Sequence, residues 1–231
     1  MEFMLLFTQR KGTECGPGGM AEMQEFAAEL ASQGKLRRGA PLAPEATGAR
    51  VRVRAGQAFV SDGPFAESKE VVGGFFLVEA ASREEAIEIA RRAPHARWGN
   101  VEVSLAPGRL AVADSGRGAP FLLAYHVEPG LTDPDGSKMR EMIAYGEALE
   151  REGKFLESAP LAREPRPARL EPRDGKVLVT DGPFAETREM VGGYGIVRAG
   201  SRAEAIEIAK HCPHARWGPI EVREILYFDP V

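Results

Sequence analysis

The chain repeats a long segment of itself 119 residues further on. The sequence Asp-Gly-Pro-Phe-Ala-Glu at 62–67 recurs at 181–186, and Pro-His-Ala-Arg-Trp-Gly at 94–99 recurs at 213–218. Between Val60 and Val103, 29 of 44 positions are identical to the second copy in an alignment without gaps. A period this long indicates a duplicated domain rather than a solenoid of short repeats.

The duplication divides the 231 residues into two units. We predict a first unit at 1–106, a linker at 107–119 and a second unit at 120–231. Hydrophobic residues make up 43% and charged residues 28% of the chain, as in ordinary globular proteins. The net charge of −4 argues against a nucleic-acid partner. No apolar run reaches the ~20 residues of a membrane span, so we expect no membrane partner and a cytoplasmic location.

No sequence motif indicates a metal or a cofactor, and we expect none. Cys15 and Cys212 occupy different repeat positions and are expected to be reduced thiols. His211 and His214 have a metal-like spacing, but no thiol or carboxylate set accompanies them. Gly73-Gly74 lacks the further glycines of a dinucleotide-binding loop.

Each unit is expected to run strand, helix, strand, hairpin, strand, helix, strand. In the first unit, the apolar run at 3–7 predicts a buried strand. One apolar helix face is predicted by four residues at i, i+3, i+4 and i+7, namely Met23, Phe26, Ala27 and Leu30. Alternation at 50–54 followed by Ala55-Gly56 predicts a hairpin. Ser82 with Glu85 predicts a capping box at the start of the second helix.

A sheet with both helices on one face leaves its other apolar face uncovered. Burial of apolar surface contributes ~25 cal/mol per Å², so a second sheet is the expected cover. We therefore predict that the two repeats pair with each other, sheet against sheet, about a pseudo-twofold axis. A further homo-oligomer is compatible with this arrangement.

Both units carry Asp-Gly-Pro-Phe-x-Glu-(Ser/Thr)-(Lys/Arg)-Glu, then Gly-Gly, then Glu-Ala-x-Glu and a late Glu-Val. This pattern resembles the YCII-related family in its DGPF branch. The resemblance implies an α+β fold: two tandem ferredoxin-like (β-α-β-β-α-β) units that form an intramolecular dimeric α/β barrel. It also implies a His–Asp pair as a candidate site, since the family includes a dehydrochlorinase of chlorinated hydroxyquinols. DGPF proteins are further associated with sigma-factor regulation.

Five residues are candidates for acid/base chemistry: Asp62, Asp181, His95, His214 and His126. The aspartates could transfer protons at the mouth of a pocket, or bond their own turn backbone before Gly-Pro. A histidine titrates near neutral pH and so suits proton transfer. The alternative for His95 and His214 is a surface cap at a helix end. The alternative for His126 is a loop residue that points at water.

His126 also predicts that the two units differ. It ends the first strand of the second unit, where an offset of 118 residues places Thr8 in the first unit. Only a histidine can hold a proton there near neutral pH. We therefore expect the two sites to be inequivalent.

Four further residues are candidates for binding a polar or anionic ligand: Glu67, Arg97, Glu186 and Arg216. Arginine offers a fixed fork of donors for such groups. The alternative is an internal Glu–Arg pair or two solvated side chains. Trp98 and Trp217 are expected at the core edge or at an interface, with a stacking platform as the alternative.

Two functions fit these residues. The first is a cofactor-independent acid/base enzyme, of isomerase or lyase type, that acts on a small molecule. The second is a non-catalytic module that binds a small ligand or a regulatory partner, with the link to sigma-factor regulation implied by the resemblance. A buried aspartate facing a pocket would favour the enzyme, and a solvated aspartate would favour the module.

Overall fold

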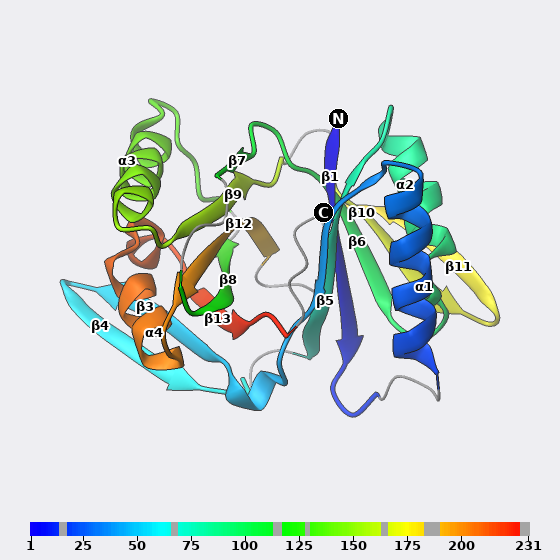
Figure 1. The fold of residues 1–231 in the computed structure, drawn as a ribbon, viewed down its shortest axis with the longest axis horizontal. Coiled ribbons are helices and arrows are strands. Elements are labelled where there is room, and N and C mark those ends of the chain that lie inside the picture. The colour runs from blue at the N-terminus through cyan, green and yellow to red at the C-terminus, as the bar shows by residue number, and fades with distance from the viewer. Residues whose placement is uncertain are drawn as a thin grey trace.

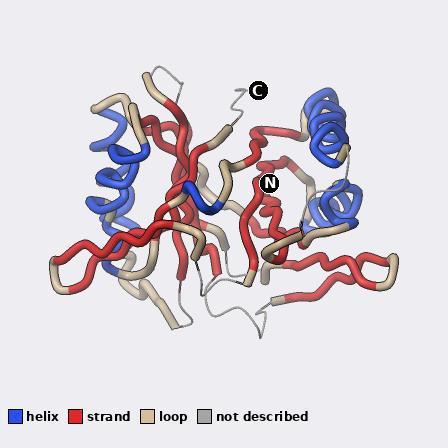
Figure 2. The backbone as a smooth tube through the Cα atoms, turned by 90° about the horizontal axis from the view of Figure 1, so that it is seen from below, coloured by secondary structure: helices blue, strands red, loops and turns tan. Residues whose placement is uncertain are grey.

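The computed structural model describes residues 1–13, 18–65, 69–112, 117–127, 130–162, 166–182 and 190–226. Two antiparallel sheets face each other, and each carries two helices on its outer side (Figures 1 and 2). The architecture is α+β, with two ferredoxin-like units arranged as an intramolecular dimeric α/β barrel. The fold expected from the sequence is thereby confirmed. Within the described ranges, no helix is both long and apolar enough to cross a membrane.

The two units repeat the same order of elements. The first unit contains β1 (Glu2–Arg10), α1 (Gly19–Ser32), β2 (Leu36–Pro41), η1 (Glu45–Thr47), β3 (Ala49–Arg54), β4 (Gln57–Asp62), β5 (Glu70–Glu79), α2 (Arg83–Arg92), η2 (Pro94–Arg97) and β6 (Asn100–Leu105). The second contains β8 (Ala119–Val127), α3 (Ser137–Arg151), β9 (Phe155–Pro160), β10 (Ala168–Arg173), β11 (Lys176–Asp181), β12 (Met190–Ala199), α4 (Arg202–His211), η3 (Pro213–Arg216) and β13 (Ile220–Glu224). Between them, the short strand β7 (Leu110–Ala111) pairs with β9.

The serine caps predicted at the second helix of each unit are present, whereas the Glu85 and Glu204 carboxylates accept from the N–H of Ala81 and Gly200, one residue before each serine. The Ser82 hydroxyl accepts a hydrogen bond from the Glu85 N–H at 3.2 Å, and Ser201 does the same for Glu204. Each side chain satisfies a backbone donor that the first helical turn leaves without a partner. The serine therefore fixes where α2 and α4 begin.

The hairpins are exchanged between the units. One sheet has the order β11-β10-β6-β1-β5-β2, and the other has β4-β3-β13-β8-β12-β9-β7. The hairpin β10–β11 therefore belongs to the sheet of the first unit, where Leu170 pairs with Val101. The hairpin β3–β4 joins the sheet of the second unit, where Val51 pairs with Ile220. Figure 1 shows the yellow β11 beside α1 and α2, and the cyan β4 beside α3 and α4.

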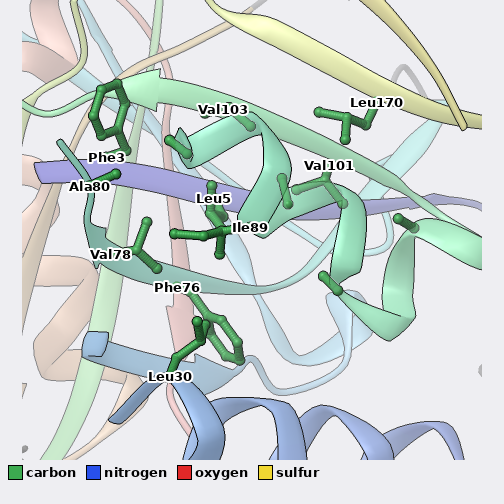
Figure 3. Close-up of a cluster of buried hydrophobic side chains, with 14 of the residues drawn as sticks. Phe3, Leu5, Leu30, Phe76, Val78, Ala80, Ile89, Val101, Val103 and Leu170 are labelled. Atoms are coloured by element: carbon green, nitrogen blue, oxygen red, sulfur yellow. The ribbon is translucent and has the colours of Figure 1, made fainter. Parts of the chain in front are cut away.

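Exchange gives each helix-covered core a contribution from the other unit. Leu170 and Ala168 are fully buried among side chains of β1, β6 and α2, as Figure 3 shows for Leu170. Ala49 and Val51 are likewise buried in the core beneath α3 and α4. Neither core is complete without a hairpin from the other half of the chain.

A third core lies between the two sheets. It is built from inward-facing residues of both units, namely Met4, Leu6, Ala40, Leu42, Phe75, Leu77, Ala106, Leu122, Ala124, Leu156, Ala159, Leu161, Tyr194, Ile196 and Ile225. These residues alternate along the strands with those that face the helices, as a sheet buried on both sides requires. The predicted packing of sheet on sheet is confirmed.

A buried ion pair lies near the pseudo-twofold axis at one edge of this core. Arg38 and Glu157 occupy equivalent positions of the two units, and Arg38 Nε lies 2.9 Å from Glu157 Oε2. Equivalent positions can touch only where the axis passes between them. Glu157 is fully buried and also accepts hydrogen bonds from Tyr194 at 2.6 Å and Arg109 at 3.2 Å.

The exchange of hairpins makes a prediction about stability. Leu170→Ala should lower the free energy of unfolding by about 2–4 kcal/mol. Leu170 is a residue of the second unit that is buried in the core of the first, so its truncation leaves a cavity in that core. The control is Leu178→Ala on the same hairpin, which is 40% exposed and should cost less than about 0.5 kcal/mol. Urea denaturation of the two variants measures both values. Similar small losses would contradict the placement of β10 on the first core.

Candidate functional site

A cleft of about 850 Å³ opens between α1 and the sheet of the first unit. Its helix side is lined by small and flexible residues, among them Met20, Met23, Ala27, Ala28 and Ala31. Its sheet side is lined by Phe7, Leu36, Phe76 and the Gly73-Gly74 pair. The alanines are too short to fill the space between helix and sheet, so an apolar hollow remains.

Two glycines of β5 keep the floor of the cleft free of side chains. A Cβ at Gly74 would lie 2.8 Å from the Ala40 carbonyl oxygen, which leaves no room for one. A Cβ at Gly73 would meet only Gln9 Oε1 at 3.7 Å and the Phe7 carbonyl at 3.9 Å. A register shift between Phe7 and Thr8 opposite this point marks a β-bulge. The floor is therefore backbone, which a ligand can approach closely.

The Asp-Gly-Pro-Phe segment supports one edge of this cleft. Lys11 Nζ lies 3.4 Å from Glu45 Oε2 and also donates to the Phe65 carbonyl. A Cβ at Gly63 would lie 2.0 Å from the Glu45 carbonyl oxygen, so only glycine fits there. The motif thus packs against the segment that carries Glu45, and it places a carbonyl for Lys11. The Gly63–Pro64 peptide bond is cis.

Asp62 and Asp181 lie at the surface, outside the cleft lining. Their side chains are 74% and 63% exposed. Asp62 pairs with Arg202, the first residue of α4, and Asp181 pairs with Arg83, the first residue of α2. Each pair joins the end of an exchanged hairpin to a helix of the unit that receives it. Neither aspartate is among the described residues that line the cleft.

His95 and His214 are buried and connect the 3₁₀ turns to the strand ends. His95 Nε2 lies 2.9 Å from the Thr8 carbonyl oxygen, and His214 Nε2 lies 2.8 Å from that of His126. Burial lowers the pKa of each ring to about 4, although the carbonyl contact opposes this. Both rings are therefore neutral at pH 7, with Nε2–H donating. His95 also lines the inner end of the cleft.

His126 belongs to a buried polar cluster between the sheets. His126 Nε2 lies 3.3 Å from Glu221 Oε2, and Arg223 and Arg50 contact the same carboxylate at 3.0 and 3.4 Å. Burial alone would raise the pKa of Glu221, but the His126 contact and the two arginines lower it to about 2.

The matching cluster of the first unit is built differently. Thr8 donates to Glu70 at 3.1 Å, and Asn100 donates to the same residue at 3.0 Å. Arg169 of the exchanged hairpin contacts Glu70 and, at 3.0 Å, Glu102. Burial raises the pKa of Glu102, and Arg169 only partly offsets this. Glu102 is the repeat equivalent of Glu221, so equivalent carboxyls shift in opposite directions.

The predicted binding residues are not gathered into one site by the residues described. Arg97 and Arg216 are exposed and pair with Glu22 and Glu141, which are equivalent residues on α1 and α3. Glu67 and Glu186 lie outside the described residues. Cys212 is buried, which raises the pKa of its thiol to about 12, and Cys15 lies outside the described residues. No group of three His, Cys, Asp or Glu in the described part of the chain could hold a metal ion.

Sequence reasoning passed over the residues that build the cleft. In the sequence analysis, Ala27 was assigned to an apolar helix face, and Gly73-Gly74 was used only to exclude a dinucleotide-binding loop. The usable signal was the combination of short residues on one helix face with two successive glycines in the facing strand. Trp98, which was expected at a core edge or an interface, lines the cleft and packs against His95 with the rings tilted by 60° and their centroids 4.0 Å apart.

Comparison with known proteins identifies the repeated unit. A model of the YCII-related domain matches residues 1–105 and again 120–229. The uncharacterized protein R00369 of Rhizobium meliloti (strain 1021) is 40% identical over 72 residues. That match covers 31% of this chain and 58% of the relative, so it spans little more than half of the relative's length. The crystal structure of the putative chlorite dismutase TA0507 superposes with a TM-score of 0.39 at 7% identity, covering 98% of this chain and 94% of that one.

The two buried histidines predict a loss of stability in mild acid. Each folded-state pKa of about 4 lies below the ordinary 6.5, so the unfolded chain binds more protons between these values. Stability is therefore complete above pH 6.5 and falls as the pH falls, by roughly 2 kcal/mol per histidine from pH 7 to pH 5. Urea denaturation at the two pH values should show this loss reduced in His95→Gln/His214→Gln. His211→Gln, which alters an exposed histidine, is the control, and an unchanged pH dependence in the double variant would refute the assignment.

Proposed function

The chain belongs to the YCII-related family, and we propose that it binds a small, largely apolar organic molecule in the cleft beneath α1. The cleft volume of about 850 Å³ lies within the ~300–1,000 Å³ of small-molecule sites. Most of its lining residues are apolar, and a group of its polar residues comes from the end of β1 and the neighbouring Glu45. This composition is typical of a site that gains affinity from apolar burial and orientation from a few polar contacts.

The polar end supports a ligand with one polar substituent. Arg10, Lys11 and Gln9 come from the end of β1, and Glu45 stands beside Lys11. Lys11 already bonds the Phe65 carbonyl and Glu45, so its ammonium is held in place by the Asp-Gly-Pro-Phe segment. A positioned cation at the end of an apolar cleft favours a ligand oriented with its polar group toward β1.

An acid/base enzyme receives less support from the same geometry. A general base must reach the proton that it abstracts, at about 2.6–3.2 Å. Asp62 and Asp181 are exposed and held in ion pairs with arginines, and they do not line the cleft. His95 does line it, but its ring is neutral and its Nε2 is committed to the Thr8 carbonyl. These observations favour a binding module over a catalyst.

Filling the cleft should abolish binding. N-phenylnaphthylamine, an uncharged aromatic probe that fluoresces in apolar surroundings, should bind saturably to the wild-type protein. At 100 times its Kd, it should stabilise the fold by about 2.7 kcal/mol. Gly73→Leu projects a side chain from the open floor and should raise the Kd at least about 10-fold, because it occupies the volume of the ligand. Fluorescence titration measures the Kd, and thermal unfolding measures the stabilisation.

Ser61→Leu adds the same side chain to the exposed strand β4 and serves as the control. It should leave the Kd within about 2-fold, in line with the small effects of surface substitutions. The equivalent glycine of the second unit is unsuitable, since a Cβ at Gly192 would lie 2.6 Å from Val127 Cγ1. A Gly73→Leu protein that unfolds cooperatively and binds the probe as tightly as wild type would exclude the cleft as the site.

A further inference from the structure

A second cavity, of about 490 Å³, adjoins the cleft on the far side of Trp98. The first unit contributes Arg10, Trp98 and Asn100 to its lining, and the exchanged hairpin of the second unit contributes Glu171 and Arg173. The cavity therefore exists only because β10 is paired with β6. Arg10 and Trp98 line both cavities, so the two spaces meet at these side chains.

The charged groups of this cavity favour an anion. Within the described ranges, Arg10 and Arg173 form no ion pair, although both are exposed to the cavity. Glu171, the carboxylate that lines it, accepts from Arg169 Nε at 2.9 Å. Glu70, which is opposite Arg10 in the register of β1 and β5, is also held by Arg169. Because Arg169 pairs with Glu171, the one carboxylate among the described lining residues has a partner outside the lining, and the two lining guanidinium groups outnumber it.

Arginine is well suited to bind an anionic group in such a cavity. Its planar fork of donors matches the oxygens of a carboxylate, sulfonate or phosphate, and it stays charged at any physiological pH. Arg10 comes from β1 and Arg173 from β10, the two strands that flank β6, so one fork from each unit lines the same cavity and both can contribute donors to one oxyanion. The indole of Trp98 supplies an apolar wall beside it, which lowers the competition from water.

We propose that this second cavity is an anion subsite, which makes the preferred ligand an amphipathic organic acid. Its apolar body occupies the cleft beneath α1, and its anionic group passes Trp98 to lie between Arg10 and Arg173. This proposal rests on the proposed function of the cleft. It assigns a role to the hairpin exchange, because the arginine that completes the subsite comes from the other unit.

The second unit offers matched positions that lack the same arrangement. Arg54 is the repeat equivalent of Arg173, and Arg52 replaces Glu171. Lys138 Nζ lies 5.8 Å from the ring centroid of Trp217, and Arg216 lies 5.7 Å from it, so the chain's own cations stand over that indole. Arg54 at the tip of β3 is therefore a control of equal chemistry and different surroundings.

A pair of fluorescent probes that differ in one anionic group tests the subsite. Anilinonaphthalenesulfonate shares its aromatic body with N-phenylnaphthylamine and adds a sulfonate. The sulfonated probe should bind wild-type protein at least about 10-fold more tightly, as a charge-assisted contact with two arginines would give. Arg173→Gln and Arg10→Gln should each raise its Kd about 10-fold. Arg173→Gln, which alters a residue outside the cleft lining, should leave the Kd of the neutral probe within about 2-fold. Arg54→Gln should change neither.

The outcomes separate this proposal from the one on which it rests. Equal affinity for the two probes, or a sulfonate affinity that Arg173→Gln leaves unchanged, would overturn the anion subsite while the cleft stands. Binding of both probes that Gly73→Leu leaves unchanged would overturn the cleft itself. No saturable binding of either probe would overturn both. Circular dichroism in the aromatic region checks that each variant is folded, since loosely packed states bind such probes without a specific site.

Discussion

The exchange of hairpins is the constraint on which the rest of the structure depends. Each sheet gains two strands from the other unit, and each helix-covered core gains buried residues from them, Leu170 in one case and Val51 in the other. Each sheet is apolar on both of its faces, and exposing an apolar face to water is unfavourable. The helices cover the outer face, so the second sheet covers the inner face. The two repeats therefore share three cores, and neither helix-covered core is complete without residues from the other repeat.

The same exchange produces the polar chemistry of the molecule and its asymmetry. Arg169 and Arg50 are equivalent residues of the two hairpins, and each enters the polar cluster of the other unit. Arg169 contacts three glutamates, whereas Arg50 shares one glutamate with His126 and Arg223. The two units thus share the same backbone fold, but the charged residues of their polar clusters differ. The cleft beneath α1 is lined mostly by the first unit, with Arg223 and Leu226 contributed by the second.

The sequence predicts the elements well because their signals are local. The capping serines, the turn at Ala55-Gly56 and the order of strands and helices depend on neighbours within a few residues, and the repeat confirms each one twice. The exchange of hairpins could not be predicted from the sequence. The strand β3 could pair with the edge of its own sheet or with the edge of the other sheet, because both edges offer the same pattern of hydrogen-bonding groups. The burial of His95 could not be predicted either, since it depends on a carbonyl 87 residues away. The candidate site was missed because glycines and alanines create the cleft, whereas the sequence analysis looked for reactive side chains.

The contact between Arg38 and Glu157 joins opposite charges at equivalent positions of the two repeats. In a dimer of identical subunits, a residue beside the twofold axis meets its own copy, so this position would place arginine against arginine or glutamate against glutamate. Opposite charges at one symmetry-related position require two different sequences, which the two diverged repeats of this chain supply. Once buried, such a pair makes each half a poor partner for itself, since like charges would be brought together out of water. The two halves are therefore complementary at this position, and a symmetric dimer of either half would place two like charges beside its twofold axis.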